Sequence, residues 1–372
     1  MTTLESDGIF ANIDLLVLSH GSLTHVHPYL LYFRERGHSV TWATLGTVVG
    51  PPSAIEGVEV TPVAPDWPGR EQSLRKVLQL RNVKALRALL RERKPDLVHA
   101  HFLSSAGLLA LLAGAAPLVV TVHGSDLTGR MPLLRKLVAR AVSSRAALLN
   151  PVSAPLELAL RGVCARNSDF LVATLGIELD SLPFDPKPTL QEEPRLLCTR
   201  SLEDIYDPAT VVEAVDRLRR TGLAAKLTFA AGGSLSDDLK QRVSAAGLED
   251  AVRFLGGFSA SELPGLFQSH DLYVSASHRD GTSLSLLEAM ASGIYPVVSR
   301  IPANQAWLTD AADAQLFEPG NVDALASAVR AALAEPRPEA ALAANRARVE
   351  RDGDRLKNFE RLEKSFVALR AG

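Results

Sequence analysis

Short apolar runs alternate with stretches of helical spacing along the chain, and this alternation is the main structural signal in the sequence. In the first half the apolar runs are DLLVLSH (14–20), GHSVTWATL (37–45), KPDLVHAH (94–101), APLVVTVHG (116–124) and ALLNPVS (147–153). Continuous apolar strands separated by helices are typical of parallel sheets that are covered by helices on both faces. The pattern therefore predicts an α/β fold.

The same alternation starts again near residue 194, which predicts a second sheet. Its expected strands are PRLLCTR (194–200), AKLTFAAGG (225–233), AVRFLGG (251–257), HDLYVSAS (270–277) and IYPVVSR (294–300). The joint before them, LGIELDSLPFDPKPTLQEEP (175–194), is rich in proline and acidic residues, as linkers often are. We expect two Rossmann-like domains, over residues 1–172 and 173–354, and a C-terminal helix over residues 355–372.

Composition narrows the class of protein. Of 372 residues, 47% are hydrophobic and 22% are charged, which is ordinary for a globular enzyme. The two cysteines, Cys164 and Cys198, are too few for a disulfide scaffold and lack metal-ligand spacing. The N-terminal stretch MTTLESDGIF has neither the basic nor the apolar region of a signal peptide, so we expect a cytoplasmic protein.

Polar residues and glycines collect where the predicted strands end. Gly21 follows the first strand, His123 follows LVVTV, Arg200 follows RLLC and Asp280 follows LYVSAS within a few residues. Ligands of open parallel sheets bind beyond the carboxyl ends of the strands, so we expect a cleft there, between the two domains. The segment SHGSLTHV after the first strand is not the glycine fingerprint of a dehydrogenase, and the sequence contains no Walker A motif.

Several segments, taken together and in order, resemble the GT-B glycosyltransferases of the large retaining family GT4. They are KPDLVHAH (94–101), TVHGSDL (121–127), LCTRSLEDIYDPATVVEA (197–214), VRFLGGFSASEL (252–263), HDLYVSAS (270–277), DGTSLSLLEAMASGIYPVVS (280–299) and FEPGNVDALASAV (317–329). The most specific element resembles the paired-acid motif of the family, with Asp280 in place of the first Glu and Glu288 as the second. The resemblance covers nearly the whole chain and implies a nucleotide-sugar donor. It also implies that the C-terminal helix, whose apolar residues at positions 356, 359, 362 and 366 share one face, packs back on the first domain.

The paired-acid segment has a physical rationale as a phosphate site. Its predicted helix start offers the backbone amides of Gly281, Thr282, Ser283 and Leu284. Unpaired amides and the positive end of the helix dipole favour an anion such as a nucleotide diphosphate. Glu288 leans towards that end and would accept hydrogen bonds from ribose hydroxyls, while Asp280 would bind hydroxyls of the donor sugar. Alternatively, Ser285 and Glu288 form a capping box that only completes the helix start.

The resemblance assigns further contacts to the donor. Arg200 would bind the phosphates, because a guanidinium can donate to two phosphate oxygens at once. The family usually has a lysine five or six residues later, where this chain has Ile205 and Tyr206. Gly21 would let the backbone approach the phosphates, or it is an ordinary turn glycine. Phe258 matches the position beside the nucleotide base, but a core position is equally compatible with the sequence.

Histidines and a second acidic pair complete the candidates. His123 resembles the histidine that touches the sugar near its reacting carbon; the alternative is a histidine satisfied within the core. His99 and His101 alternate on one face of a strand, but no carboxylate or cysteine completes a metal-ligand set. Asp352 and Asp354 mimic the acid-x-acid motif of metal-dependent glycosyltransferases, yet they lie in the charged C-terminal tail, so we expect solvated surface there.

The resemblance implies front-face transfer with retained configuration, in which the leaving phosphate takes the proton of the acceptor. Arg200 and the helix start would stabilise the charge that develops on the phosphate, so no metal and no cofactor is expected. The acceptor would be a glycan or a lipid-linked saccharide. Two alternatives stay open because the lysine is missing and the first acid is shortened: a non-catalytic partner subunit that binds nucleotide sugar, and an enzyme with another reaction, such as a sugar-nucleotide epimerase.

The charge of the chain is uneven. Residues 1–172 contain 18 Lys and Arg and 13 Asp and Glu, a net +5, and the remaining residues contain 22 and 29, a net −7, which sum to the overall −2. Between Arg70 and Lys94 basic residues greatly outnumber acidic ones, and leucines recur at helical spacing. This helix either packs its leucines on the sheet with solvated arginines or docks on an anionic membrane. Nothing in the charge pattern calls for a nucleic-acid partner.

Overall fold

The first sheet contains all five strands predicted for the first half of the chain and one more. Its order is β3-β2-β1-β4-β5-β6, and every neighbouring pair is parallel. The strands are β1 (Asp14–His20), β2 (Ser39–Leu45), β3 (Glu59–Ala64), β4 (Leu97–His101), β5 (Leu118–Val122) and β6 (Leu148–Pro151). The extra strand, β3, lies at the edge and is half exposed, and its sequence EVTPVA lacks the continuous apolar run of the others.

The second sheet repeats this architecture. Its order is β12-β11-β10-β7-β8-β9, again parallel throughout. The strands are β7 (Arg195–Cys198), β8 (Lys226–Phe229), β9 (Val252–Phe254), β10 (Leu272–Ser275), β11 (Tyr295–Ser299) and β12 (Gln315–Phe317). Only the three-residue edge strand β12 was not predicted. Two parallel sheets with helices confirm the expected α/β fold with two Rossmann-like sheets.

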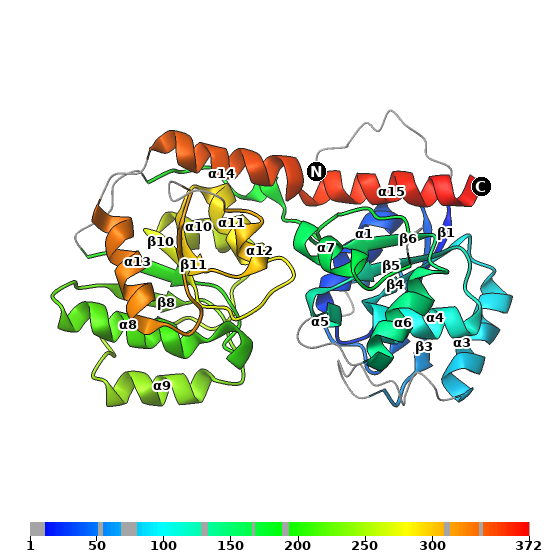
Figure 1. Cartoon of the computed structure of the whole chain (residues 1–372), viewed down its shortest axis with the longest axis horizontal. Coiled ribbons are helices and arrows are strands. Elements are labelled where there is room, and N and C mark those ends of the chain that lie inside the picture. The colour runs from blue at the N-terminus through cyan, green and yellow to red at the C-terminus, as the bar shows by residue number, and fades with distance from the viewer. Residues whose placement is uncertain are drawn as a thin grey trace. The chain divides into compact units, whose positions relative to one another are not determined.

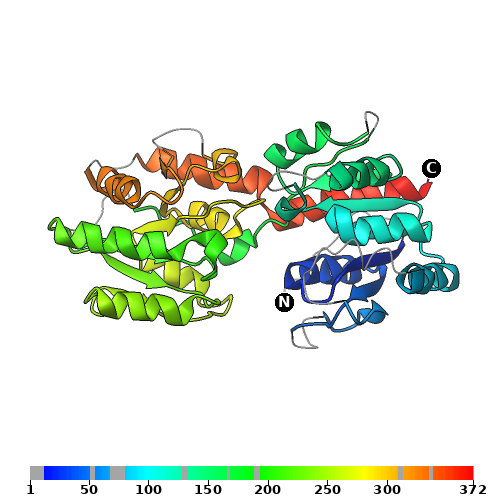
Figure 2. The same ribbon diagram turned by 60° about the horizontal axis from the view of Figure 1, so that its bottom comes forward.

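Helices cover both faces of each sheet (Figure 1 and Figure 2). The first sheet is accompanied by α1 (His27–Glu35), α3 (Leu80–Arg93), α4 (Leu108–Ala113), α5 (Gly124–Leu127), α6 (Leu133–Ser143), α7 (Ala154–Arg161) and α15 (Arg355–Ala371). The second is accompanied by α8 (Pro208–Arg220), α9 (Ser236–Ala245), α10 (Leu263–Gln268), α11 (Leu284–Ser292), α12 (Pro302–Gln305), α13 (Val322–Ala334) and α14 (Glu339–Asp352). Each sheet therefore has one apolar cluster on each face.

The computed structural model divides into two units, Met1–Leu175 with Lys357–Gly372, and Gly176–Leu356. We call them unit 1 and unit 2. The residues described are 12–50, 55–67, 80–127, 133–165, 168–187, 193–308, 313–334 and 338–371. None of the helices within these ranges combines the length and the hydropathy that crossing a bilayer requires.

The C-terminal helix α15 packs against α1 in unit 1. Phe366 stacks on Phe33 with ring centroids 5.2 Å apart, and Phe359 contacts Tyr29 at 4.6 Å. The predicted apolar face is correct at positions 359, 362 and 366, whose side chains are buried, but Leu356 is 44% exposed. Leu356 lies in the first turn of the helix, before it reaches the apolar surface of unit 1.

A buried carboxylate also ties α15 to unit 1. Glu363 is 1% exposed and accepts hydrogen bonds from the Tyr32 hydroxyl at 2.7 Å and from Nε2 of His38 at 2.9 Å. Nδ1 of the same imidazole accepts the amide of Ile13, so the Nε2 atom must carry the proton. Arg36 lies 3.3 Å from the carboxylate. Burial acts to raise the pKa of Glu363, but the bonds from His38 and Tyr32 hold it below its ordinary value.

The described part of the basic segment, α3, packs its apolar side on the first sheet. Leu86 and Leu89 are buried in the core there. Arg81 pairs with Asp66, and Arg93 pairs with Glu59. The packing interpretation thus holds for the leucines of this helix. The earlier basic residues, Arg70, Arg75 and Lys76, lie outside the described residues.

Candidate active site

Two residues predicted from separate strands meet at one point of unit 2. Arg200 follows β7 and Asp280 follows β10, and these strands are neighbours because the order of the sheet reverses between them. A guanidinium nitrogen of Arg200 lies 2.7 Å from a carboxylate oxygen of Asp280, and both side chains are nearly buried. A reversal point of this kind is where open parallel sheets bind their ligands. The ion pair therefore marks the candidate site.

Other groups fix the orientation of Arg200. The Tyr206 ring lies against its guanidinium, with 3.9 Å between the guanidinium carbon and the ring centroid. The Ser283 and Ser285 hydroxyls lie 3.4 and 3.5 Å from Nη1. The sequence names Tyr206 only as a position where the usual lysine is missing, whereas the structure places its aromatic face on the cation. Tyr206, at one of the two positions where the family usually has a lysine, therefore supports the side chain of Arg200.

The helix start differs from the predicted capping box. The N-cap of α11 is Ser283, whose hydroxyl accepts the amide of Leu286 at 3.3 Å, two residues before the predicted cap. Ser285 lies inside the first turn and hydrogen-bonds the Tyr273 hydroxyl at 2.8 Å. Because the cap is Ser283, Glu288 is not part of a capping box, and that alternative is wrong. The amides of the first turn have no intrahelical acceptors, as at any helix start.

Asp280 holds the groups that the sequence assigned to phosphate. One carboxylate oxygen accepts the amide of Gly281 at 2.7 Å, and the other pairs with Arg200. Thr282 donates its hydroxyl to the carbonyl of Gly281 at 2.9 Å. Asp280 therefore connects Arg200 to the loop before α11. Its predicted contact with the hydroxyls of a donor sugar stays a prediction.

Glu288 is a carboxylate of α11 with a raised pKa. It lies one turn further along α11 than the amides of the helix start, and no hydrogen bond to its carboxylate is recorded within the described residues. Burial raises the pKa of Glu288 to about 7, although Arg355 and Arg200 act to lower it. A half-buried carboxylate with a raised pKa, one turn from a helix start, is suited to hydroxyl groups of a ligand.

The binding of a nucleotide should depend on the ionisation of Glu288. If ribose hydroxyls donate to the carboxylate, the ionised form binds better, so affinity falls as the pH drops through about 7. We expect the dissociation constant to rise about tenfold between roughly pH 8 and pH 6. Glu288→Gln should flatten this profile, since the phosphates of the ligand titrate equally in both proteins. Calorimetric titrations at several pH values measure it, and parallel profiles for the two proteins would contradict it.

His123 belongs to a cluster of aromatic and imidazole rings at the carboxyl edge of the first sheet. Its Nε2 lies 3.2 Å from Nδ1 of His101, and its ring contacts Phe102 at 4.5 Å and His25 at 4.9 Å between centroids. Burial lowers the pKa of His101 and His123 well below the ordinary value, so both rings are neutral at pH 7. A neutral His123 can exchange hydrogen bonds with a sugar but cannot act as a cation.

Asp126 is a residue that sequence reasoning passed over. It is buried and accepts the amides of Leu103 and His123, both at 3.0 Å, and thereby fixes the loops after β4 and β5. Burial raises the pKa of Asp126 to about 7. Phe102, between those loops, has φ of +76°, a strained conformation for a residue with a bulky side chain. The TVHGSD segment thus contains both a candidate sugar contact and the carboxylate that positions it.

Two further candidates are explained by packing. The amide of Gly21 donates to Leu45, and a Cβ atom at Gly21 would lie 2.7 Å from the Thr47 carbonyl oxygen. This close approach accounts for the glycine, and its phosphate contact stays a prediction. Phe258 is half-buried at the margin of the apolar cluster around α11. That position leaves part of the ring exposed, and a contact with the base stays a prediction.

The two strand histidines, His99 and His101, lie side by side on β4, and the absence of a metal there stays a prediction. The rings of His99 and His101 lie 4.5 Å apart, and Nε2 of His99 bonds the Thr121 hydroxyl at 2.7 Å. Throughout the described ranges, no group of three His, Cys, Asp or Glu side chains has an arrangement that could hold a metal ion. Asp352 and Asp354 lie where α14 meets α15: Asp352 pairs with Arg351, and Asp354 accepts the amide of Leu356.

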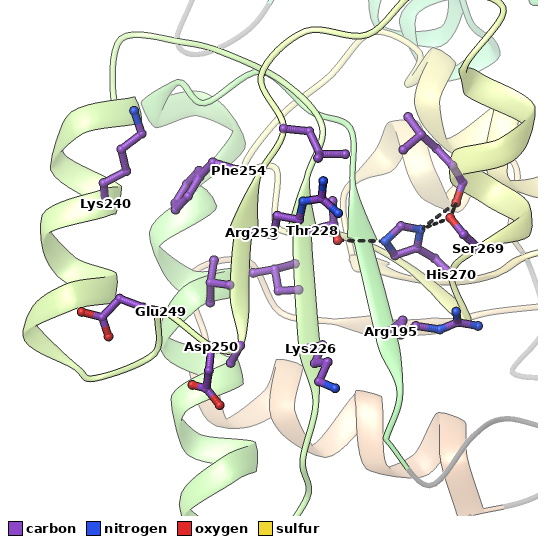
Figure 3. Close-up of a pocket in the computed structure, with 15 residues that line it drawn as sticks. Arg195, Lys226, Thr228, Lys240, Glu249, Asp250, Arg253, Phe254, Ser269 and His270 are labelled. Carbon is purple, nitrogen blue, oxygen red and sulfur yellow. Dashed lines mark hydrogen bonds between the residues drawn. The ribbon is translucent and has the colours of Figure 1, made fainter.

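The pocket drawn in Figure 3 lies elsewhere on unit 2. It has a volume of about 710 Å³ and lies over β8 and β9, with His270 bonded to Thr228. Three of the four lysines and arginines that line it, Arg195, Lys226 and Lys240, have acidic partners, and Arg253 is the fourth. None of the predicted site residues lines it. We therefore assign the candidate site to the ion pair and α11 rather than to this pocket.

Two family models match consecutive parts of the chain. The description "Glycosyl transferase 4-like" matches residues 14–150, and "Glycosyl transferases group 1" matches residues 184–349. The first range contains β1 to β5 and most of β6, and the second contains the whole candidate site of unit 2. The family-model matches do not depend on the geometry of the ion pair. They place the group 1 model on the half of the chain that contains Arg200 and Asp280.

Curated relatives are similar over part of their length. A GDP-mannose-dependent alpha-(1-6)-phosphatidylinositol monomannoside mannosyltransferase of Mycolicibacterium smegmatis is 24% identical over 64% of this chain and 67% of its own. A D-inositol 3-phosphate glycosyltransferase of an Arthrobacter species is 30% identical over 57% of each chain. A glycogen synthase of Mycobacterium tuberculosis is 28% identical over 70% of this chain and 64% of its own. The aligned regions thus cover about three fifths to two thirds of these relatives.

Solved structures show the same fold at low identity. Sucrose-phosphate synthase from Thermosynechococcus elongatus has a TM-score of 0.76 at 17% identity, covering 96% of this chain and 99% of its own. Anabaena HepE, solved in complex with UDP-glucose, has a TM-score of 0.75 at 15% identity and covers 96% and 100%. Together with the family models, these similarities place the chain among the GT-B proteins, and it belongs to the group 1 (GT4) glycosyltransferase family.

Proposed function

We propose that the protein is a retaining glycosyltransferase that moves a sugar from a nucleotide-diphosphate donor to a saccharide or lipid-linked acceptor without a metal. The observation that carries this proposal is the buried Arg200, held by Asp280 and Tyr206 beside the start of α11. The half-buried Glu288 on the same helix supports it, since ribose hydroxyls would donate hydrogen bonds to its carboxylate. Similar proteins solved with UDP or UDP-glucose support a donor of this class.

The proposed chemistry is stabilisation of the leaving group. As the bond between the anomeric carbon and the phosphate oxygen breaks, negative charge grows on the β-phosphate. The forked donors of Arg200 and the amides at the start of α11 would stabilise that charge, because both are already oriented before the reaction. The acceptor hydroxyl attacks the same face, and its proton passes to the leaving phosphate oxygen. Asp280 is a poor covalent nucleophile in this arrangement, since both of its oxygens already have partners.

Each unit receives one role in this proposal. Unit 2 would bind the nucleotide through Arg200, Glu288 and the helix start. Unit 1 would bind the acceptor at the carboxyl edge of its sheet, where His123 is held by Asp126. A neutral imidazole there would exchange hydrogen bonds with sugar hydroxyls, in keeping with the predicted contact of His123 near the reacting carbon.

Transfer should survive removal of divalent metals. Because Arg200 and the helix start would meet the phosphate charge, EDTA should lower the rate of transfer by less than about twofold, which corresponds to under 0.5 kcal/mol in the barrier. Initial rates with EDTA and with added manganese test this. Complete loss of activity that manganese restores would contradict the metal-free mechanism.

The donor is identified by a screen of UDP-, GDP- and ADP-sugars for thermal stabilisation, followed by turnover assays with the best binder. A ligand stabilises the folded state by an amount that grows with the ratio of its concentration to its dissociation constant, so at equal concentrations the tightest-binding donor should raise Tm most. A second function stays open because Ile205 and Tyr206 occupy the positions that usually carry a lysine. Strong stabilisation by a nucleotide sugar with no transfer to any acceptor would favour a non-catalytic partner subunit.

A further inference from the structure

Helix α6 of unit 1 has an apolar face that nothing in the described structure covers. Leu133, Leu134 and Leu137 are 73%, 56% and 55% exposed. At about 100° per residue, these three positions form one stripe on the helix. The opposite side is occupied by Val138, Ala139 and Val142, which are buried in the core of unit 1. The exposed leucines are thus additional to the face that packs the helix.

Positive charge borders this stripe. Lys136 and Arg140 lie on its flank, and both are exposed. The sequence of α6, LLRKLVARAVS, contains no acidic residue, and Arg145 follows closely. Among the described residues, Lys136, Arg140 and Arg145 have no acidic partner. In α3, by contrast, Arg81 and Arg93 are paired.

The direction of α6 places its exposed leucines near the carboxyl edge of the first sheet. The helix precedes β6 in a parallel sheet, so it runs against the strands and begins near their carboxyl ends. The leucines occupy its first five residues, and the helix packs beside η3 (Phe102–Gly107), which follows β4 (Figure 1). The ring cluster with His123 lies at this same edge. An acceptor anchored at the α6 face would therefore reach the acceptor edge of unit 1.

We propose that the leucine and cation face of α6 docks on an anionic lipid surface. Lipid headgroups of negative charge suit Lys136 and Arg140, and the acyl boundary suits the leucines beside them. This inference deepens the proposed function, since it assigns the lipid-linked acceptor to a membrane beside unit 1. It replaces α3 as the membrane-facing helix, because the leucines of α3 are used in the core.

A second copy of the chain fits this face less well. Stable protein–protein interfaces bury about 800 Å² on each partner, far more than three leucine side chains provide. A basic helix opposite its own symmetry mate would also bring like charges together. A lipid surface needs neither a large complementary area nor a matching shape.

Vesicle sedimentation tests the docking face on the full chain. The probe is a vesicle of phosphatidylcholine with about 30 mol% phosphatidylglycerol, compared with phosphatidylcholine alone, at low and high salt. We expect binding to the anionic vesicles at low salt, reduced at high salt. Leu134→Ser with Leu137→Ser should lower the partition coefficient by on the order of tenfold, and Lys136→Gln with Arg140→Gln should lower it and reduce its salt dependence.

Matched variants distinguish binding through this face from nonspecific adsorption to vesicles. Leu158→Ser removes a leucine that is 75% exposed on α7 of the same unit, and Lys84→Gln with Arg91→Gln removes two exposed cations of α3. Both should bind vesicles like the wild type, with unchanged Tm. Wild-type protein that stays in the supernatant at low salt would overturn the inference, as would equal binding by the serine pair.

Two separate readouts keep the outcomes distinct. If sedimentation velocity shows a dimer for the wild type and a monomer for the serine pair, the face binds a second copy of the chain instead. That result would also overturn the inference. Transfer to a water-soluble acceptor is measured in parallel and should be unchanged in the serine pair. Wild-type protein that transfers sugar to the water-soluble acceptor but does not bind the anionic vesicles therefore refutes only the membrane surface, whereas absent transfer in the wild type refutes the proposed function.

Discussion

Arg200→Ala is expected to lower kcat/KM about 10- to 150-fold. A charged hydrogen bond to a phosphate is worth about 1.5–3 kcal/mol, and each 1.36 kcal/mol changes the rate tenfold. The loss should fall mainly on kcat, because the negative charge on the leaving phosphate grows in the transition state. Steady-state kinetics with the donor found by the thermal screen measure the effect. The neighbouring Tyr206 and Asp280 cannot replace the cation, since neither carries positive charge.

Arg300→Ala is the matched control for this experiment. Arg300 follows β11 at the same edge of the same sheet, but its side chain is 47% exposed and pairs with the exposed Glu318. Its loss should change kcat/KM less than about twofold, since exposed ion pairs contribute about 0–1 kcal/mol. If Arg200→Ala turns over like the wild type with an unchanged Tm, Arg200 has no part in the site.

Glu363→Ala is expected to destabilise unit 1 by about 3–5 kcal/mol. Removing one partner of a buried charged network leaves the others unsatisfied, and such losses are large. Here the hydroxyl of Tyr32 and Nε2 of His38 would both lose their acceptor. The ion pair between Glu35 and Arg34 in the same unit is exposed, so Glu35→Ala should cost under about 1 kcal/mol.

Urea unfolding monitored by tryptophan fluorescence measures this difference. Trp42 and Trp67 lie in unit 1 and Trp307 lies in unit 2, so a Trp307→Phe background reports on unit 1 alone. The wild-type network should also weaken in acid. Because the pKa of Glu363 is held low in the folded state, its contribution is present above the unfolded pKa and is lost as the pH falls through the folded one. Equal unfolding midpoints for Glu363→Ala and Glu35→Ala would contradict this account.

The strands of both sheets could be predicted because buried parallel strands are continuous apolar runs. The two exceptions, β3 and β12, are edge strands. β3 is buried on one side only and β12 has three residues, so the composition of each resembles that of a loop. Membership of α15 in unit 1 rested on the resemblance. The carboxylate of Glu363 on its apolar face was a signal, since positions 359, 363 and 366 share one side of a helix.

The residues of the candidate site could be named from the sequence, but their interactions could not. Arg200 and Asp280 are 80 positions apart, and their contact depends on β7 lying beside β10, which the local pattern does not encode. Ser283 and Ser285 are both acceptable caps, and only the backbone geometry decides between them. The role of Tyr206 depends on a ring orientation that no spacing predicts.

The most direct test of the central claim is the anomeric configuration of the first transfer product. Proton NMR during the first turnovers, with an α-linked nucleotide-sugar donor and EDTA present, should show an α-linked product and released nucleoside diphosphate. Arg200→Ala should give the same product more slowly. A β-linked product, or tight donor binding without any transfer, would contradict the proposal that unit 2 supports retaining, metal-independent transfer.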